Sequence, residues 1–147
     1  MNNQRFSSRN FSDVASKLET PDNQVCLLHE RVRKSEANDF SVARKHEVHI
    51  VELPSRALSM TFGALKPLQA SGLHRHNYET MIYIISGAGF SMIGEARVAW
   101  AAGDAIYIPV WEWHRHVNTS ETAEATYIAC ENTPLLQTLG IALREEA

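Results

Sequence analysis

Residues 47–132 are divided into short β-forming segments by glycine, proline, asparagine and aspartate, and no other pattern in the sequence narrows the fold as much. Several of the segments alternate apolar and polar residues, as a strand with one buried face does. They recur at intervals of about 8–12 residues, which is typical of an antiparallel sandwich or barrel. The expected strands cover residues 24–32, 47–53, 56–65, 76–87, 89–94, 96–104, 105–118 and 124–132.

The two ends of the chain differ from this region. Residues 1 to about 23 are polar and rich in asparagine and serine, so residues 1–46 are interpreted as an N-terminal arm that includes the first strand. At the other end, Thr133 can cap a helix and Pro134 suits its first position, which predicts a short C-terminal helix over residues 133–147. Because no internal repeat is visible, residues 47–132 are expected to form one barrel.

Composition excludes several classes of protein. The chain has 147 residues, enough for one domain, and its net charge of −3 argues against a nucleic-acid-binding surface. No run approaches the ~18 consecutive apolar residues of a membrane span, and the N-terminus has no apolar segment of a signal peptide. Cys26 and Cys130 lack a CxxC spacing, so we expect two reduced, mostly buried thiols and a cytoplasmic location.

Four of the seven histidines form two HxH pairs. His74 and His76 lie in GLHRHNYETMIYIISGAG, and His114 and His116 lie in GDAIYIPVWEWHRHVN. Because side chains alternate along a strand, the two members of each pair point the same way. One such pair alone would be interpreted as exposed histidines. Two pairs, each next to a hydrophobic strand, indicate that at least three imidazoles bind one divalent metal ion.

Here the sequence resembles the cupin superfamily. The family's first motif contains HxH followed by a glycine, and its second contains glycine, proline, histidine and asparagine at fixed spacing. The matching residues are His74, His76 and Gly87 in the first motif, and Gly103, Pro109, His114 and Asn118 in the second. The resemblance covers about residues 47–132. It implies an all-β fold, a single jelly-roll barrel of two antiparallel sheets with the metal held inside.

The sequence departs from the family at one metal-binding position. Many cupins carry a glutamate where this chain has Thr80, and the nearby Glu79 is one position early. If His76 faces inward, strand parity turns Glu79 outward unless a bulge intervenes. We therefore expect His74, His76 and His114 as the metal ligands. His116 is expected to support the site or to act as an acid–base group. The alternative is that His116 is itself a fourth metal ligand.

Three neutral imidazoles leave the full charge on the metal and leave coordination positions open, as in catalytic sites. The segment PVWEWHRH, with HRH upstream, resembles the gentisate 1,2-dioxygenase group of cupins. This resemblance implies that the metal is Fe(II). It also implies a dioxygenase reaction that cleaves a carbon–carbon bond of an aromatic or dicarbonyl-type small molecule. Zn, Mn and Ni are alternative metal ions for the same histidines. Any of them would fit a non-oxidative enzyme, such as an isomerase, cyclase or lyase. A non-catalytic binding module is the third hypothesis.

Other residues have weaker assignments. Tyr78 is a candidate to hydrogen-bond a substrate oxygen, and Asn118 is expected to stabilise the end of its strand. Trp111 and Trp113 either line the mouth of the site or pack. The arginines are expected mainly at the surface: Arg75 and Arg115 opposite the histidines, Arg56 and Arg97 as candidates for a substrate carboxylate. His29, His46 and His49 are assigned no function. Because cupin barrels commonly pair, we expect a homodimer.

Overall fold

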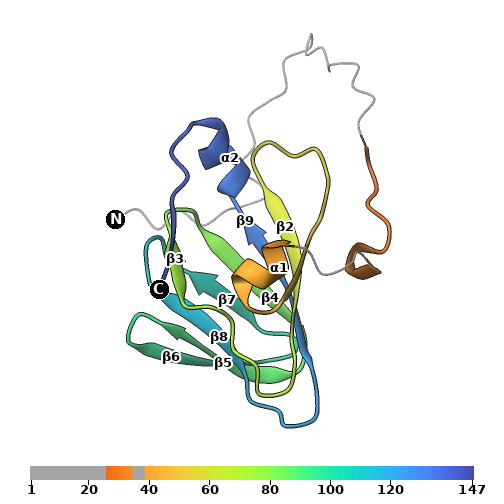
Figure 1. The fold of residues 1–147 in the computed structure, drawn as a ribbon, viewed down its shortest axis with the longest axis vertical. Coiled ribbons are helices and arrows are strands. Elements are labelled where there is room, and N and C mark those ends of the chain that lie inside the picture. Colours follow the sequence, from red (N-terminus) through yellow and green to blue (C-terminus); the bar gives the residue numbers. More distant parts are fainter. Residues whose placement is uncertain (1–25, 35–38) are drawn as a thin grey trace, which may run out of the picture.

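The computed structural model describes residues 26–34 and 39–147, and two antiparallel sheets that face each other form its centre (Figure 1). The strands are β1 (Glu47–Ile50), β2 (Ser59–Leu65), β3 (His74–His76), β4 (Thr80–Ser86), β5 (Ala88–Ile93), β6 (Ala96–Ala101), β7 (Ala105–Ile108), β8 (His114–Asn118), β9 (Ala125–Glu131) and β10 (Arg144–Glu146). One sheet has the order β1-β2-β9-β4-β7, and the other has the order β10-β3-β8-β5-β6. This arrangement confirms the predicted jelly-roll barrel.

Two of the expected strands divide, because the chain crosses between the sheets inside them. The segment 76–87 contains the end of β3 in one sheet and β4 in the other. The segment 105–118 likewise becomes β7 and β8, with Trp111 in the turn at a φ of +66°. Each crossing places a metal-binding motif beside a sheet-to-sheet turn.

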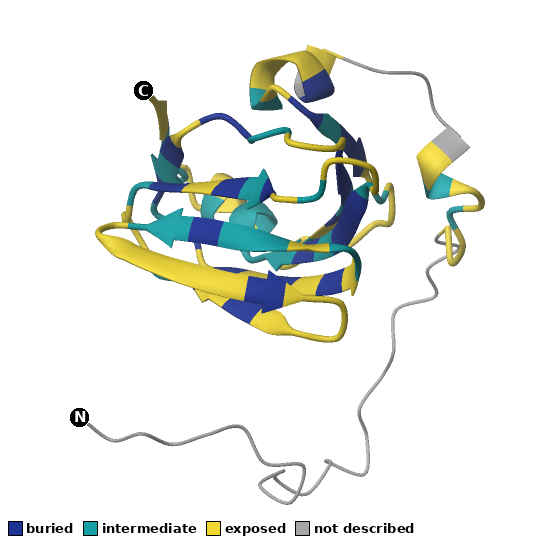
Figure 2. Ribbon diagram, turned by 90° about the horizontal axis from the view of Figure 1, so that it is seen from below, coloured by how far each residue is buried: buried dark blue, intermediate teal, exposed yellow. Residues whose placement is uncertain are grey.

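The hydrophobic core lies between the two sheets and follows strand alternation. Along β4 the side chains of Thr80, Ile82 and Ile84 are buried, while Met81 and Tyr83 are exposed. The core cluster draws on both sheets, as Figure 2 shows by the buried segments inside the barrel. It contains Ile82, Ile84, Trp100, Ile106, Ile108, Ala125, Tyr127 and Ala129. Burial of this apolar surface stabilises the barrel that holds the histidines.

The strand predicted for residues 24–32 is wrong in its described part. Residues 26–29 have no regular structure, and a short 3₁₀ helix, η1, spans Val32–Lys34; residues 24 and 25 lie outside the described residues. A helix that the sequence did not predict, α1 (Asp39–Arg44), follows instead. Ser41 ties it to β1, because its hydroxyl oxygen accepts from the Val48 N–H at 3.0 Å and donates to the Val48 carbonyl at 2.9 Å.

The C-terminal helix is confirmed but is shorter than predicted. Helix α2 covers only Thr133–Thr138, and Asn132, not Thr133, is its N-cap residue. Gly140 follows with a φ of +71°, a left-handed conformation that suits glycine and ends the helix. The chain then turns back as β10, which pairs antiparallel with β3. The last predicted helical turns are therefore a strand beside the first histidine motif.

Two further expectations can be compared with the described residues. Both cysteines are free, but Cys26 is exposed and Cys130 is half-buried, so the expectation of mostly buried thiols is wrong. Of the predicted arm over residues 1–46, residues 1–25 and 35–38 lie outside the described part of the chain. In the described part, every helix is too short or too polar to cross a membrane.

The side chain of Asn118 closes the end of β8, as the sequence predicted. It is fully buried, and its amide donates to the carbonyls of Leu65, Lys66 and Ala123 at 2.8 to 3.1 Å. Its Oδ1 accepts from the Ser120 N–H at 2.9 Å.

We predict that Asn118→Ala lowers the free energy of unfolding by about 2–3 kcal/mol, because the truncation leaves buried carbonyls without donors. The exposed Glu121, in the same loop, supplies the control: Glu121→Ala should change stability by less than about 0.5 kcal/mol. Urea denaturation measures both. Equal stability of the two variants would contradict this role of Asn118.

Candidate metal centre

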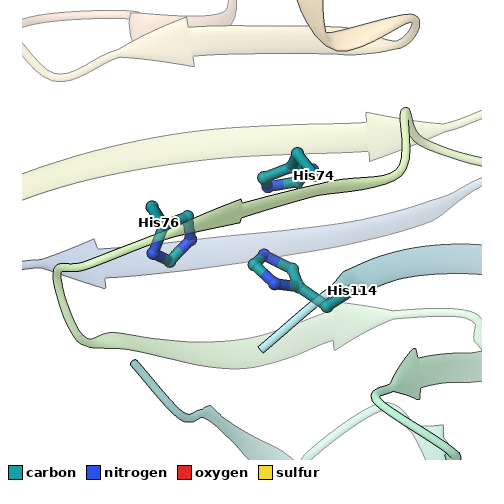
Figure 3. A group of neighbouring side chains, drawn as sticks. All are labelled: His74, His76 and His114. Carbon is teal, nitrogen blue, oxygen red and sulfur yellow. The ribbon is translucent and has the colours of Figure 1, made fainter. Parts of the chain in front are cut away.

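Three histidine side chains converge inside the barrel from two neighbouring strands (Figure 3). His74 and His76 are two residues apart on β3 and share its inward face, and the register of β3 with β8 pairs His74 with His114. All three are buried, and one potential ligand nitrogen from each lies within 4.8 Å of the others. The geometry brings together the three residues that the sequence proposed.

The backbone fixes the orientation of each of these rings. In every case Nδ1 lies at hydrogen-bond distance from a carbonyl two residues away, so Nδ1 carries the proton and donates. The acceptors are the carbonyls of Gly72 for His74 (2.9 Å), Tyr78 for His76 (2.8 Å) and Glu112 for His114 (2.8 Å). Nε2 is therefore left unprotonated on each ring, which is the form that binds a metal ion.

Burial also keeps the rings neutral. It lowers the pKa of His74 and His114 and lowers that of His76 to about 3. For His74 and His76, the positive charge that His114 would carry when protonated lowers the pKa further. At neutral pH the cluster therefore presents uncharged nitrogen donors, which fit a divalent cation without competition from protons.

His116 lies beside this cluster but outside the group of three. Its Nδ1 is 2.7 Å from the hydroxyl of Ser91, which also accepts from the indole N–H of Trp100 at 3.0 Å. Burial lowers the pKa of His116 to about 3, so the ring is neutral at physiological pH. The ring centroids of His116 and His114 are 5.8 Å apart, so His116 is placed to support the neighbouring His114 ring.

Glu79 and Tyr78 lie where the sequence predicted them. Strand parity placed Glu79 on the outer side, and Tyr78 was expected beside the metal-binding histidines. Glu79 is exposed and accepts from the hydroxyl of Tyr107 at 3.0 Å, so its carboxylate points away from the histidines. Tyr78 stacks on the ring of His76 with centroids 3.9 Å apart and an interplanar angle of 3°. The centre thus has three imidazoles and an aromatic wall, with no carboxylate from Glu79.

Two cavities lie in this part of the molecule, and they share some of their lining residues. A small inner cavity of about 50 Å³ is lined by the four motif histidines and by side chains from the facing sheet. An outer cavity of about 430 Å³ is lined by Tyr78, by α2 and by the residues before β10. Arg44, Thr61, Glu131 and Arg144 line both spaces. These four side chains are therefore shared by the cavity that holds the metal-binding rings and the larger cavity.

Sequence reasoning missed four residues of this region: Arg44, His46, Glu131 and Arg144. His46 was assigned no function, yet it lines the inner cavity, and its Nε2 lies 2.5 Å from the Tyr127 hydroxyl. Glu131 is half-buried at the end of β9, and desolvation raises the pKa of its carboxyl. Thr80, which stands where many cupins carry a glutamate, donates to Glu131 at 3.3 Å. The place of Glu131 near the end of the predicted strand 124–132 was the available signal for this residue.

The other assigned side chains lie away from the cavities. Trp111 and Trp113 flank the guanidinium of Arg75, which is 4.6 and 4.7 Å from their ring centroids, so they pack on the outside and do not line the mouth. Arg75 also pairs with Glu145 at 2.7 Å. Arg56, Arg97 and Arg115 are exposed, which supports surface roles.

Part of the chain is similar to proteins of a known family. Residues 61–130 match the model of the cupin domain. A 5-aminosalicylate 1,2-dioxygenase of Comamonas sp is 32% identical over 90 residues, which are 61% of this chain and 23% of that protein. Gentisate 1,2-dioxygenase 1 of Aquipseudomonas alcaligenes is 32% identical over 98 residues, 58% of this chain and 28% of that protein. The chain spans about a quarter of the length of these curated relatives.

Solved structures share the fold. A salicylate 1,2-dioxygenase from Pseudaminobacter salicylatoxidans superimposes with a TM-score of 0.66 at 19% identity, covering 74% of this chain and 33% of that one. A cupin 2 conserved barrel domain protein from Rhodopseudomonas palustris has a TM-score of 0.52 at 22% identity, covering 58% of this chain and 59% of that one. Residues 61–130, somewhat less than half of the chain, thus match a cupin domain, and the barrel and the converging histidines agree with that match. The chain is similar to proteins of the gentisate 1,2-dioxygenase group.

Proposed function

We propose that this chain forms an Fe(II)-dependent dioxygenase centre that cleaves a carbon–carbon bond of a small aromatic or dicarbonyl-type molecule. The convergence of three neutral imidazoles, with no carboxylate among them, carries this proposal. The aromatic ring dioxygenases among the relatives support it. Because the chain spans only part of those relatives, the activity, the substrate and the iron are all part of the proposal.

The donor set fits a resident divalent ion. His74, His76 and His114 would hold it through Nε2, since each Nδ1 is engaged with the backbone. When bound, Fe(II) would supply Lewis acidity and the electron transfer that reaction with dioxygen requires. Uncharged ligands do not offset its charge, so an anionic substrate complements the centre better than a neutral one.

The remaining side chains of the cavities would bind the substrate and handle its protons. Tyr78 stacks on the His76 ring and lines the outer cavity, where its hydroxyl would hydrogen-bond a substrate oxygen. His116, kept neutral by burial, lines the inner cavity and would hold a proton for transfer on one ring nitrogen. The carboxyl of Glu131, whose raised pKa makes it a better base than an exposed glutamate, can accept a proton from a substrate hydroxyl.

We also propose a homodimer as the assembly and the cytoplasm as the location. Barrels of this family commonly pair, and the two cysteines are free. The exposed apolar side chains on the outer face of β4 and β7 offer a surface for pairing. They include Met81, Tyr83, Ile85 and Tyr107.

We predict that His74→Ala, His76→Ala and His114→Ala each weaken Fe(II) binding by more than about a hundredfold, because each removes one of three ligands. Glu79→Ala, which removes an exposed carboxylate from the same segment, should leave the metal content at the wild-type value. Metal analysis after equilibrium dialysis measures both. A large loss of metal in Glu79→Ala, with little loss in the histidine variants, would contradict the ligand set.

Acid should destabilise the metal-free protein. The folded state keeps its buried histidines neutral with lowered pKa values, whereas the unfolded chain protonates them below about pH 6.5. The unfolded state therefore binds more protons, so stability falls as the pH falls below about 6.5, by up to about 1.4 kcal/mol per pH unit for each such histidine. Urea midpoints of metal-free protein at pH 7 and pH 5 measure this. Unchanged midpoints would mean that the rings are already protonated when folded.

Oxygen consumption tests the proposed reaction. The Fe(II)-loaded protein should consume O₂ when gentisate, a salicylate or a diketone is added, and the His114→Ala variant should not, because it lacks the metal. An oxygen electrode records the uptake, and mass spectrometry identifies the product. Turnover that needs no O₂ and is as fast with zinc as with iron would contradict the dioxygenase proposal and favour the non-oxidative alternative.

A further inference from the structure

A groove at the surface of the molecule is separate from the outer cavity. It has a volume of about 450 Å³, and residues of α1, of β1 and of the turn after β2 are among those that line it. Of the described residues, His46 alone lines both this groove and the inner cavity, and none lines both the groove and the outer cavity. We call it the lysine groove, because Lys45 and Lys66 are among its lining residues.

The side chain of Gln69 holds the backbones of the two lysines beside one groove. Its Oε1 accepts from the Lys66 N–H at 2.8 Å, and its Nε2 donates to the Lys45 carbonyl at 2.9 Å. Lys45 comes shortly before β1 and Lys66 directly follows β2, so one amide joins two segments that are far apart in the sequence. The positive side chains are therefore brought together by a specific contact and not by the sequence alone.

The backbone of Lys45 has a conformation that a lysine rarely adopts. Its φ is +59°, in the left-handed region. Two hydrogen bonds maintain it: the Lys45 N–H donates to the Val42 carbonyl at 3.1 Å, and the Lys45 carbonyl accepts from Gln69. Residues held in such conformations cluster at binding sites, where the surrounding structure maintains them. The strained residue here is one of the two lysines that line the groove.

The charges of the two lysines are not balanced by acidic groups of the described residues. The third basic residue of the groove, Arg33, is already paired, with Glu47 at 3.1 Å and with Glu124 at 2.7 Å. Glu47, the acidic residue of the lining, also lies 2.9 Å from Nε2 of His49. Both lysines are exposed, and neither forms an ion pair with a described residue. The groove therefore offers two positive charges to an anion.

We propose that the lysine groove binds the phosphate group of a small molecule, with Lys45 and Lys66 as its counter-charges. A lysine ammonium is a compact charge with three donors, which suits the several acceptor oxygens and the double charge of a phosphate. The volume of the groove falls in the range of small-ligand sites, so it has room for an organic group as well as the phosphate. Free phosphate and a phosphorylated small molecule share this chemistry. The proposal does not depend on the proposed function, because it concerns a different cavity.

An NMR titration locates the bound anion. The full chain, labelled with ¹⁵N and loaded with zinc so that a diamagnetic ion fills the histidine centre, is titrated with inorganic phosphate at constant, low ionic strength. The amides of Lys45, Lys66 and Gln69 should shift and saturate together, with smaller shifts at Arg144 in the outer cavity. Sodium chloride at the same ionic strength should produce no saturating shift at these amides.

Charge-removing variants test the role of the lysines. Because both are exposed, Lys45→Gln and Lys66→Gln should each weaken phosphate about threefold, and the double variant about tenfold. Arg115→Gln is the matched control, since it removes an exposed charge from β8, in the other sheet, and it should bind phosphate as the wild type does. If a change at the strained Lys45 prevents folding, Lys66→Gln alone still tests the site.

Phenyl phosphate, titrated in parallel, identifies the source of the phosphate group. If it binds more tightly than inorganic phosphate, the groove takes a phosphorylated small molecule, and if the two bind equally, the groove takes free phosphate. In both cases the affinity should fall in the double variant. Shifts at the metal-binding histidines or at Arg144 without shifts in the groove, the same shifts with chloride, or an unchanged affinity in the double variant would overturn the proposal.

Discussion

The centre of this protein depends on three hydrogen bonds from imidazole to backbone. Each metal-binding histidine donates its Nδ1 proton to a carbonyl two residues away, in the turn before or after its own strand. These bonds select one tautomer and one ring orientation, so Nε2 is the nitrogen that each ring leaves available to an ion. Preorganisation of this kind lets a site of neutral donors compete with water for a divalent cation.

The barrel and its flanking elements contribute different parts of the site. The two sheets bury the rings and lower their pKa values, which keeps them available to a metal at neutral pH. The short helix α1 and the edge strand β10 add two charged side chains, Arg44 and Arg144, to the lining of the inner cavity. In this division the barrel supplies the three histidine rings, and the flanking segments supply charged side chains that line both cavities.

The sequence alone predicted the barrel and the three histidines because both follow from local patterns. Period-two alternation and two HxH pairs are visible without tertiary information, and strand parity correctly turned Glu79 outward. Arg144 could not be found in this way, since the pairing of β10 with β3 is a long-range outcome. Arg44 lies in a six-residue helix with too few residues to show a periodic face.

Anomalous diffraction at the iron edge, from crystals grown anaerobically with Fe(II), tests the central claim most directly. We expect one peak, at about 2.0–2.2 Å from Nε2 of His74, His76 and His114, with each Nδ1 still bonded to its carbonyl. A peak held by other side chains, or rings rotated so that Nδ1 binds the ion, would contradict the account.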